Sequence, residues 1–139
     1  METPLFWGLR GLQRAVAVEA QRASRTGRAF TLVRINLGGP PPLEQRDILR
    51  RVVLSELRGT DFVHETRAGE LGVLLPETAG PEATTPIERV REALGQAMPE
   101  IHVSIGSAGA GPGTGRSWQE AWRWAGTLLV ADAAVPAAA

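Results

Sequence analysis

The chain of 139 residues contains no cysteine and no lysine, and it has only two histidines. Without cysteine, neither a disulfide framework nor thiolate chemistry is available to it. His64 and His102 are too few and too far apart in the sequence to form a metal cluster. The composition therefore predicts neither a disulfide-bonded protein nor a metal centre, and we expect no cofactor.

Long apolar runs and an excess of charge of one sign are also absent. No apolar run reaches the roughly 18 residues that a membrane span needs, and the N-terminus lacks the basic and apolar segments of a secretory signal. Fifteen arginines balance fifteen acidic residues, and a net charge of zero argues against a nucleic-acid binder held by bulk charge. We therefore expect a cytoplasmic protein that binds neither membrane nor nucleic acid.

What is present is typical of one ordinary globular domain. Hydrophobic residues make up 43% and charged residues 22% of the chain. A length of 139 residues fits one domain with one core. We place this domain at residues 1–132 and expect a flexible tail over residues 133–139, where the sequence carries little information.

The stretch from Asp61 to Thr78, DFVHETRAGELGVLLPET, predicts two strands joined by a tight turn. Gly69 can take the positive φ that such a turn needs, and Pro76 ends the second strand because proline cannot donate to a ladder. The run from Leu71 to Leu75 is nearly continuous in apolar residues, which is typical of a strand covered on both faces.

The rest of the chain divides into helices and strands around this hairpin. We expect helices over residues 5–25, 43–58, up to about 98 and from 117 onward, strands over 30–37 and 101–107, and a flexible loop or hairpin over 108–116. The third helix begins either at a capping box over Thr85–Glu88 or at Pro81 with a kink at Pro86, and Ser117–Glu120 is a second capping box. The order α-β-α-β-β-α-β-α favours an α/β (α+β) fold with an open sheet and helices on its faces.

Three sequence words, GELGVLLPET, IERVR and VSIGSA, together with this order of elements, resemble the GGDEF domain of diguanylate cyclases over residues 1–132. The segment Arg67–Leu71 stands where the family has its GGDEF turn, and Val103–Gly106 matches the family's SIG strand. The resemblance implies a mostly antiparallel central sheet flanked by helices and a role in bacterial signal transduction. It also implies the family's reaction, in which two GTP molecules form cyclic di-GMP on metal ions held by two carboxylates.

This chain departs from the family's catalytic pattern at the positions that the resemblance aligns. Arg67 and Ala68 replace the paired glycines, Gly69 replaces the metal-binding acid, and Asn36 stands where the first strand of the family ends in a metal-binding aspartate. Glu70 alone survives, and a single glutamate in a turn is expected to be solvated rather than catalytic. We therefore expect an inactive enzyme with no catalytic residues and no metal.

The family's inhibitory product site, in contrast, is matched in full. Arg58-Gly59-Thr60-Asp61 has the Arg-x-x-Asp pattern and ends five residues before the turn, and Arg89 stands at the position of the family's second arginine. Arginine can reach guanine O6 and N7 together and stack on the base, and aspartate can accept from guanine N–H groups. The resemblance thus implies a cyclic di-GMP receptor that binds through Arg58, Asp61 and Arg89, with ligand-linked homodimerisation or a protein partner.

Two alternatives stay open at this point. Arg58 could cap the end of a helix and Asp61 could pair with it locally, without any ligand. The domain could also be a protein-interaction or dimerisation module that has lost nucleotide binding. The glycine-rich stretch Gly109–Gly115 is not a phosphate loop, because it lacks the Lys-Ser/Thr ending.

Overall fold

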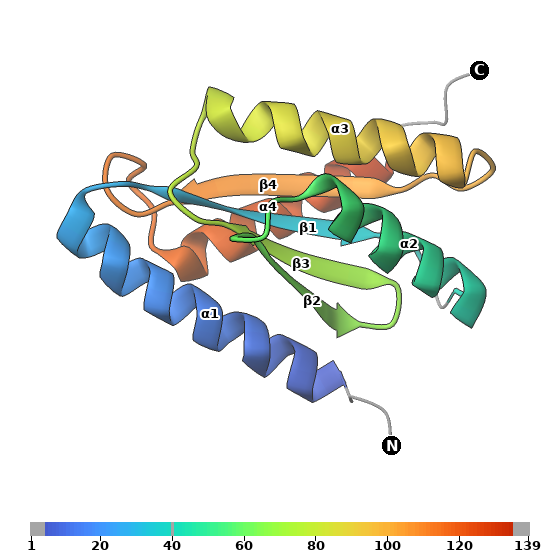
Figure 1. Ribbon diagram of the computed structural model, residues 1–139, viewed down its shortest axis with the longest axis horizontal. Helices are drawn as coiled ribbons and strands as arrows, with labels where there is room; N and C mark the ends of the chain where they lie inside the picture. The colour runs from blue at the N-terminus through green and yellow to red at the C-terminus, as the bar shows by residue number, and fades with distance from the viewer. Residues whose placement is uncertain (1–4, 40, 135–139) are drawn as a thin grey trace.

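The structure, a computed structural model, describes the backbone of residues 5–39 and 41–134, and the side chains from Arg10 onward within that part. It contains eight elements in the predicted order: α1 (Leu5–Thr26), β1 (Phe30–Asn36), α2 (Leu43–Glu56), β2 (Phe62–Arg67), β3 (Glu70–Leu75), α3 (Pro81–Ala97), β4 (Ser104–Ala110) and α4 (Trp118–Ala133). Figure 1 shows their arrangement along the chain.

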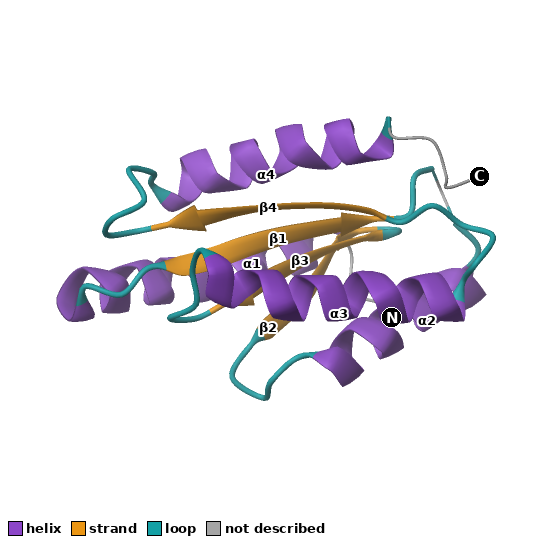
Figure 2. Ribbon diagram, turned by 90° about the horizontal axis from the view of Figure 1, so that it is seen from above, coloured by secondary structure: helices purple, strands orange, loops and turns teal. Residues whose placement is uncertain are grey.

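The four strands form one antiparallel sheet in the order β2-β3-β1-β4, so the predicted fold class is confirmed. Helices α2 and α3 cover one face of the sheet and α4 covers the other (Figure 2). Helix α1 packs against β2 and β3 and joins α4 in the second core. The sheet is therefore the middle of three layers, as its two apolar faces require.

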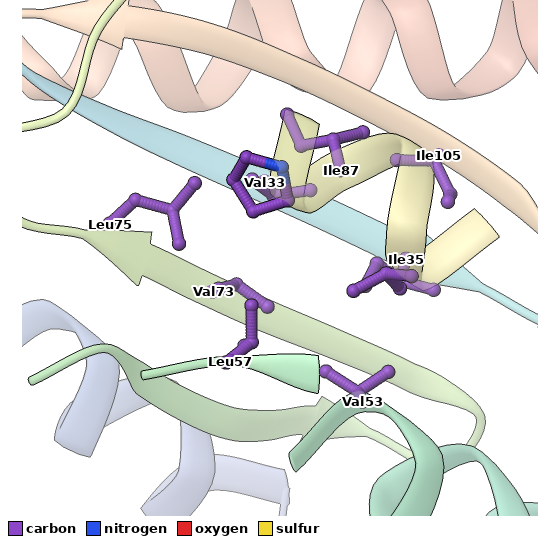
Figure 3. A pocket seen from close by; sticks show the side chains of 10 residues that line it. Val33, Ile35, Val53, Leu57, Val73, Leu75, Ile87 and Ile105 are labelled. Atoms are coloured by element: carbon purple, nitrogen blue, oxygen red, sulfur yellow. The ribbon is translucent and has the colours of Figure 1, made fainter. Parts of the chain in front are cut away.

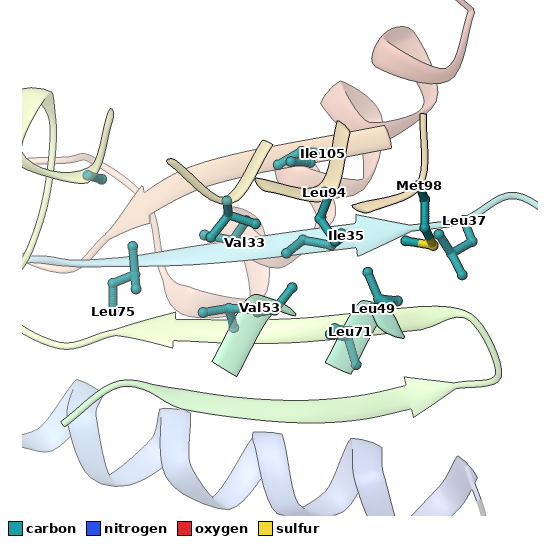
Figure 4. Close-up of a cluster of buried hydrophobic side chains, with 13 residues drawn as sticks. Val33, Ile35, Leu37, Leu49, Val53, Leu71, Leu75, Leu94, Met98 and Ile105 are labelled. Carbon is teal, nitrogen blue, oxygen red and sulfur yellow. The ribbon is translucent and has the colours of Figure 1, made fainter. Parts of the chain in front are cut away.

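The larger core lies between the sheet and helices α2 and α3 (Figure 4). Val33 and Ile35 of β1 project into it together with Leu71 and Leu75 of β3. Val73 of β3 faces the same core, whereas Leu74 faces the second core, so all six residues of β3 are buried; this confirms that the strand is covered on both faces.

The second core depends on a close approach between α4 and β4. A Cβ atom on Gly106 would lie 2.1 Å from the carbonyl oxygen of Ala125, so only glycine allows the helix to pack at this distance. Ala121, Ala125 and Trp122 fill the space between α4 and the sheet, whereas Trp124 is 44% exposed. The capping box at Ser117 and Glu120, which begins α4, is formed as the sequence predicts.

Of the two starts that the sequence left open for helix α3, the structure has the one at Pro81, with Pro86 inside the helix. Two other predicted boundaries are wrong. Helix α2 ends at Glu56, two residues early, because the backbone N–H of Arg58 is bonded to the Asp61 carboxylate at 2.8 Å. Strand β4 covers Ser104–Ala110 because Ser104 is paired with Asn36, the last residue of β1.

Of the loop or hairpin expected over residues 108–116, the structure has a hairpin: residues 108–110 belong to β4, and Gly111 is bridged to Arg116 in antiparallel pairing. The Thr114 hydroxyl donates to the carbonyl of Gly111 at 2.7 Å, and the N–H of Gly111 donates to the carbonyl of Arg116 at 3.0 Å. The predicted tail starts at residue 133, within the last turn of α4, and residues 135–139 lie outside the described part. None of the described helices is long and apolar enough to span a membrane.

Candidate functional site

The turn between β2 and β3 lies against the loop that follows β1. Gly69 has φ of 83°, and a Cβ atom there would lie 2.8 Å from the ring of Pro41. The backbone N–H of Leu37 donates to the Gly69 carbonyl at 2.9 Å, which fixes the loop to the turn. Gly69 therefore lies against Pro41 at the point where the resemblance would place a nucleotide.

Glu70, the first residue of β3, lies below this turn with a side chain that is only 2% exposed. Arg34 and Thr66 donate to its Oε2 atom, each at 3.1 Å. Asn36 donates to its Oε1 atom at 3.1 Å, and Arg67 reaches the same atom at 2.9 Å. Four side chains from strands β1 and β2 thus converge on one carboxylate, so our expectation that Glu70 is solvated is wrong.

Arg34 has further contacts that hold it in place. Its guanidinium carbon lies 4.4 Å from the centroid of the Trp122 ring, a cation–π distance, and its Nη1 donates to the Trp122 carbonyl at 3.3 Å. Arg34 is 18% exposed, so its charge is compensated inside the protein by Glu70 and the Trp122 ring. No motif or spacing in the sequence pointed to Arg34 or to this ion pair.

These residues do not fit a pair of divalent cations. Magnesium requires several oxygen ligands with free lone pairs, whereas both carboxylate oxygens of Glu70 already accept from two guanidinium groups, and Asn36 and Gly69 supply no charge. Within the described part of the chain, no group of three or more His, Cys, Asp or Glu side chains is placed to hold a metal ion.

The second predicted site lies between the end of α2 and the start of β2. Arg58 Nη2 donates to Asp61 Oδ1 at 3.0 Å and to the Thr78 hydroxyl at 2.9 Å. The Asp61 side chain is 2% exposed, whereas that of Arg58 is 57% exposed. The structure therefore contains the local pair that we named as an alternative. In this arrangement Asp61 positions Arg58 and presents no free carboxylate edge to solvent.

Arg58, Asp61 and Arg89 line one cavity of about 370 Å³. Arg89, on α3, is 54% exposed and donates to the backbone carbonyl of Glu56 at 3.3 Å, close to the Glu56 carboxylate at 3.9 Å. A volume of 370 Å³ falls within the range of small-molecule sites. The structure thus brings together the three residues that the sequence selected.

Sequence reasoning missed several residues of this cavity, chiefly Arg28, Glu77 and Thr78. Arg28, from the loop after α1, contributes a third arginine and lies 3.8 Å from the Glu77 carboxylate. Glu77 has φ of 52°, a left-handed conformation that costs energy in a residue with a Cβ atom, and such strain is common at functional sites. No motif pointed to these residues, because the fold brings their loops together.

Among the described residues, the two groups whose pKa is shifted lie outside this cavity. Burial lowers the pKa of His64 in β2 below its usual value. Hydrogen bonds from the backbone and then the side chain of Ser117 lower the pKa of Glu120 at the start of α4.

An apolar gap between the sheet and helices α2 and α3 is no alternative site. Figure 3 shows side chains such as Leu57, Val73 and Ile87 pointing into it. Its volume of about 10 Å³ is barely enough for one water molecule, and its lining carries no polar surface. The gap is a small packing space within the core shown in Figure 4 rather than a binding site.

Comparisons with known proteins agree with this fold. The sequence model of the family described as GGDEF-like domain matches residues 4–125. No curated protein matches the chain at a significant level.

Solved structures of similar fold include the diguanylate cyclase SiaD in complex with its activator SiaC from Pseudomonas aeruginosa, with 20% identity and a TM-score of 0.72 over 89% of this chain. This chain spans about half of the SiaD chain, 54% of its length. The GGDEF domain of DgcB from Caulobacter crescentus, in complex with c-di-GMP, has 17% identity and a TM-score of 0.71 over 88% of this chain and 82% of its own. The active GGEEF domain of a diguanylate cyclase from Vibrio cholerae has 16% identity and a TM-score of 0.73 over 88% of this chain and 87% of its own.

Proposed function

The chain belongs to the family of GGDEF-like domains, and from that premise we propose that it is a catalytically inactive receptor for cyclic di-GMP. The observation that carries the proposal is the position of Arg58, Asp61 and Arg89 around one cavity of about 370 Å³. The similar domain of DgcB was solved with c-di-GMP, which makes this ligand the first to test.

The state of the former catalytic turn supports the loss of activity. Glu70 accepts from two arginines, and Asn36 and Gly69 offer no carboxylate beside it. Pro41 lies over Gly69, so the backbone of the turn is covered where a nucleotide would approach it. We expect no product from GTP with Mg²⁺ or Mn²⁺, and formation of cyclic di-GMP above background would refute this part of the proposal.

Each cavity residue has a distinct role in the proposed complex. Arg58 is exposed and held on one side by Asp61 and Thr78, so its free edge can bind a guanine or a phosphate with little loss of side-chain entropy. Asp61 acts as a positioning residue, because its carboxylate is buried against Arg58. Arg89 on α3 and Arg28 in the loop after α1 bring two further guanidinium groups to the cavity, whose lining also includes the carboxylates of Glu77 and Glu82. A ligand with two phosphates could also bridge two copies of the domain.

Titration calorimetry with cyclic di-GMP tests the proposal. We expect Arg58→Ala to weaken binding at least about tenfold, since a charge-assisted hydrogen bond contributes about 1.5–3 kcal/mol. Arg89→Ala should weaken it less. The control is Arg123→Ala, which removes an exposed arginine on α4 that is not part of the cavity. Absence of heat at tens of micromolar ligand, or equal affinity of the Arg58→Ala and Arg123→Ala variants, would refute cyclic di-GMP binding at this cavity.

A second function, a protein-interaction module without nucleotide binding, is favoured by a different observation. Arg58 and Arg89 already pair with Asp61 and Glu56, so the cavity is partly neutralised without any ligand. Leu43 and Leu54 of α2 are 65% and 54% exposed and could contribute to a protein contact. Partner binding that ignores both cyclic di-GMP and the Arg58→Ala substitution would favour this function over the receptor.

A further inference from the structure

Strand β4 forms one outer edge of the sheet, since it is paired only with β1 among the described strands (Figure 1). In an antiparallel strand, the backbone N–H and C=O groups of alternate residues point to the same side. The N–H of Ile105 points away from β1, because it donates to Asp132 Oδ2 at 2.7 Å. The same alternation turns the backbone groups of Ser107, Gly109 and Gly111 outward.

Both ends of this outward edge are closed. Asp132 covers the N–H of Ile105, and Arg91 holds the same Asp132 oxygen at 3.2 Å. At the other end, the N–H of Gly111 donates to the Arg116 carbonyl. Closed ends of this kind are how proteins prevent their edge strands from pairing with other chains over a long distance.

Ser107 and Gly109 lie between the closed ends, and we name their outward backbone groups the β4 window. Within the described part of the chain, no hydrogen bond to their outward N–H and C=O groups is found. Both residues are partly exposed, whereas Gly106, Ala108 and Ala110 between and beside them are buried. The window therefore offers two backbone donors and two acceptors without partners.

A hollow of about 290 Å³ lies directly in front of the β4 window, between α3 and α4. Trp124 lines it with an indole that is 44% exposed, and the Arg116 guanidinium lies 5.9 Å from the centroid of that ring. Thr84 and Ile87 of α3 form the opposite wall. No acidic residue is among those that line the hollow, so Arg116 gives it a net positive charge.

From this arrangement we infer that the β4 window is a docking site for a short extended peptide segment of another protein. The segment adds two or three residues to the edge of the sheet, with backbone hydrogen bonds to Ser107 and Gly109. It places an apolar side chain on Trp124 and a carboxylate near Arg116, which is the charge complementary to this hollow. The inference does not depend on nucleotide binding, because the hollow shares no lining residue with the cavity of Arg58, Asp61 and Arg89, which we call the arginine cavity.

A second copy of the chain fits this edge less well. Symmetric pairing of two β4 strands would need the whole edge and would have to displace Asp132 from Ile105 and Arg116 from Gly111. A short segment needs only the groups that have no partner. The window thus has the length of a peptide motif rather than of a strand exchanged between two domains.

Capped pentapeptides of alternating valine and threonine with one terminal aspartate are suitable probes. They are made in both sequence orders, so that the aspartate can reach Arg116 whether the peptide runs parallel or antiparallel to β4. Asparagine in place of the aspartate gives the neutral control. Added at up to about 1 mM to ¹⁵N-labelled full-length chain, a binding peptide should shift the amide signals of Ser107 and Gly109 and the indole signal of Trp124. The neutral peptide should bind about threefold more weakly, as expected for a half-exposed ion pair.

Two substitutions at one position separate backbone pairing from side-chain contacts. Ser107→Pro removes the outward N–H without removing a bond to β1, a change that edge strands tolerate, and should weaken binding at least about fivefold. Ser107→Ala removes only the hydroxyl and should bind like the unchanged protein. If Ser107→Pro fails to fold, Trp124→Ala replaces it, with the same loss expected.

The inference is overturned if neither peptide shifts these signals, if the shifts lie elsewhere on the surface, or if Ser107→Pro and Ser107→Ala bind equally. It is also overturned if sedimentation shows a dimer of the chain that Ser107→Pro dissociates, because the edge would then be occupied by a second copy.

Discussion

Glu70 and Asp61 are both carboxylates with side chains only 2% exposed, and both accept from arginine, but their surroundings differ. Glu70 is bonded from β1 and β2 by Arg34, Asn36 and Thr66, and Arg67 completes the set. Among the described residues, the Asp61 carboxylate accepts only from Arg58, three residues before it, and Arg58 faces an open cavity. The first cluster ties strands together, whereas the second holds one arginine at the wall of an open cavity.

The comparison shows why retention of a residue does not reveal its use. Glu70 is the one residue that the resemblance matched to the family's catalytic pattern, yet the partners that the structure gives it are all internal. A buried carboxylate between two arginines contributes to the fold only while its partners remain, since removing one leaves a buried charge without compensation. The predictions that follow test whether the two clusters differ in this way.

The largest effect is expected at the Glu70 cluster. Glu70→Ala leaves the guanidinium of Arg34, which is 18% exposed, without its carboxylate and should lower the free energy of unfolding by about 3–5 kcal/mol. Urea unfolding followed by circular dichroism measures the change. Glu56→Ala, which removes the partly exposed partner of Arg89, is the control and should change stability by less than about 0.5 kcal/mol. Similar losses in both variants would contradict the distinction between the clusters.

The glycine of the SIG strand should come next. Gly106→Ala forces a Cβ atom toward the Ala125 carbonyl and should cost about 1–3 kcal/mol, because α4 must shift away from the sheet. That shift would also move Trp122 away from Arg34 and so weaken the Glu70 cluster. Thermal unfolding measures the loss, and Gly95→Ala in α3, where a Cβ atom meets nothing within 4 Å, is the matched control. Equal melting temperatures in the two variants would show that α4 does not pack tightly against Gly106 of β4.

Restoring the acid that the resemblance places in β1 is expected to have a smaller cost. Asn36→Asp replaces a donor to Glu70, now 3.1 Å away, by a second carboxylate and should destabilise the domain by about 1–2 kcal/mol. We expect millimolar Mg²⁺ to leave the melting temperatures of both proteins unchanged, because Arg34 and Arg67 occupy the Glu70 oxygens. A rise in the melting temperature of Asn36→Asp with Mg²⁺ alone would show that a metal site can still form.

The sequence predicted the order of elements, the hairpin and the start of α4, because each rests on local patterns of apolar residues, turns and caps. It misplaced β4, whose first residue, Ser104, is paired with the last residue of β1, Asn36. Such long-range pairing has no local signal.

The same distinction applies to the candidate sites. Arg58, Asp61 and Arg89 were found because a family pattern selects them, and the fold brings them to one cavity. The burial of Glu70 and the presence of Arg28 in the cavity were missed, because both depend on contacts between segments more than 30 residues apart.

The smallest effect concerns His64, which lies in β2 between the two clusters, with Asp61 before the strand and Thr66 near its end. Its ring lies against α1 beside Gly11, and burial lowers its pKa. In the unfolded chain histidine binds a proton near pH 6.5, whereas in the folded domain it stays neutral to a lower pH. The unfolded state therefore binds more protons below about pH 6.5, and stability should fall as the pH is lowered from 7 to 5.

Urea unfolding at several pH values measures the slope of the free energy of unfolding against pH. His64→Gln should reduce this slope, and His102→Gln, at the other histidine, is the control. A slope that is unchanged in His64→Gln would mean that the ring is hydrated in the folded state. A reduced slope with unchanged cyclic di-GMP affinity would show that the packing of β2 against α1 can be loosened without disturbing the arginine cavity, as expected if Asp61 holds Arg58 through local bonds alone.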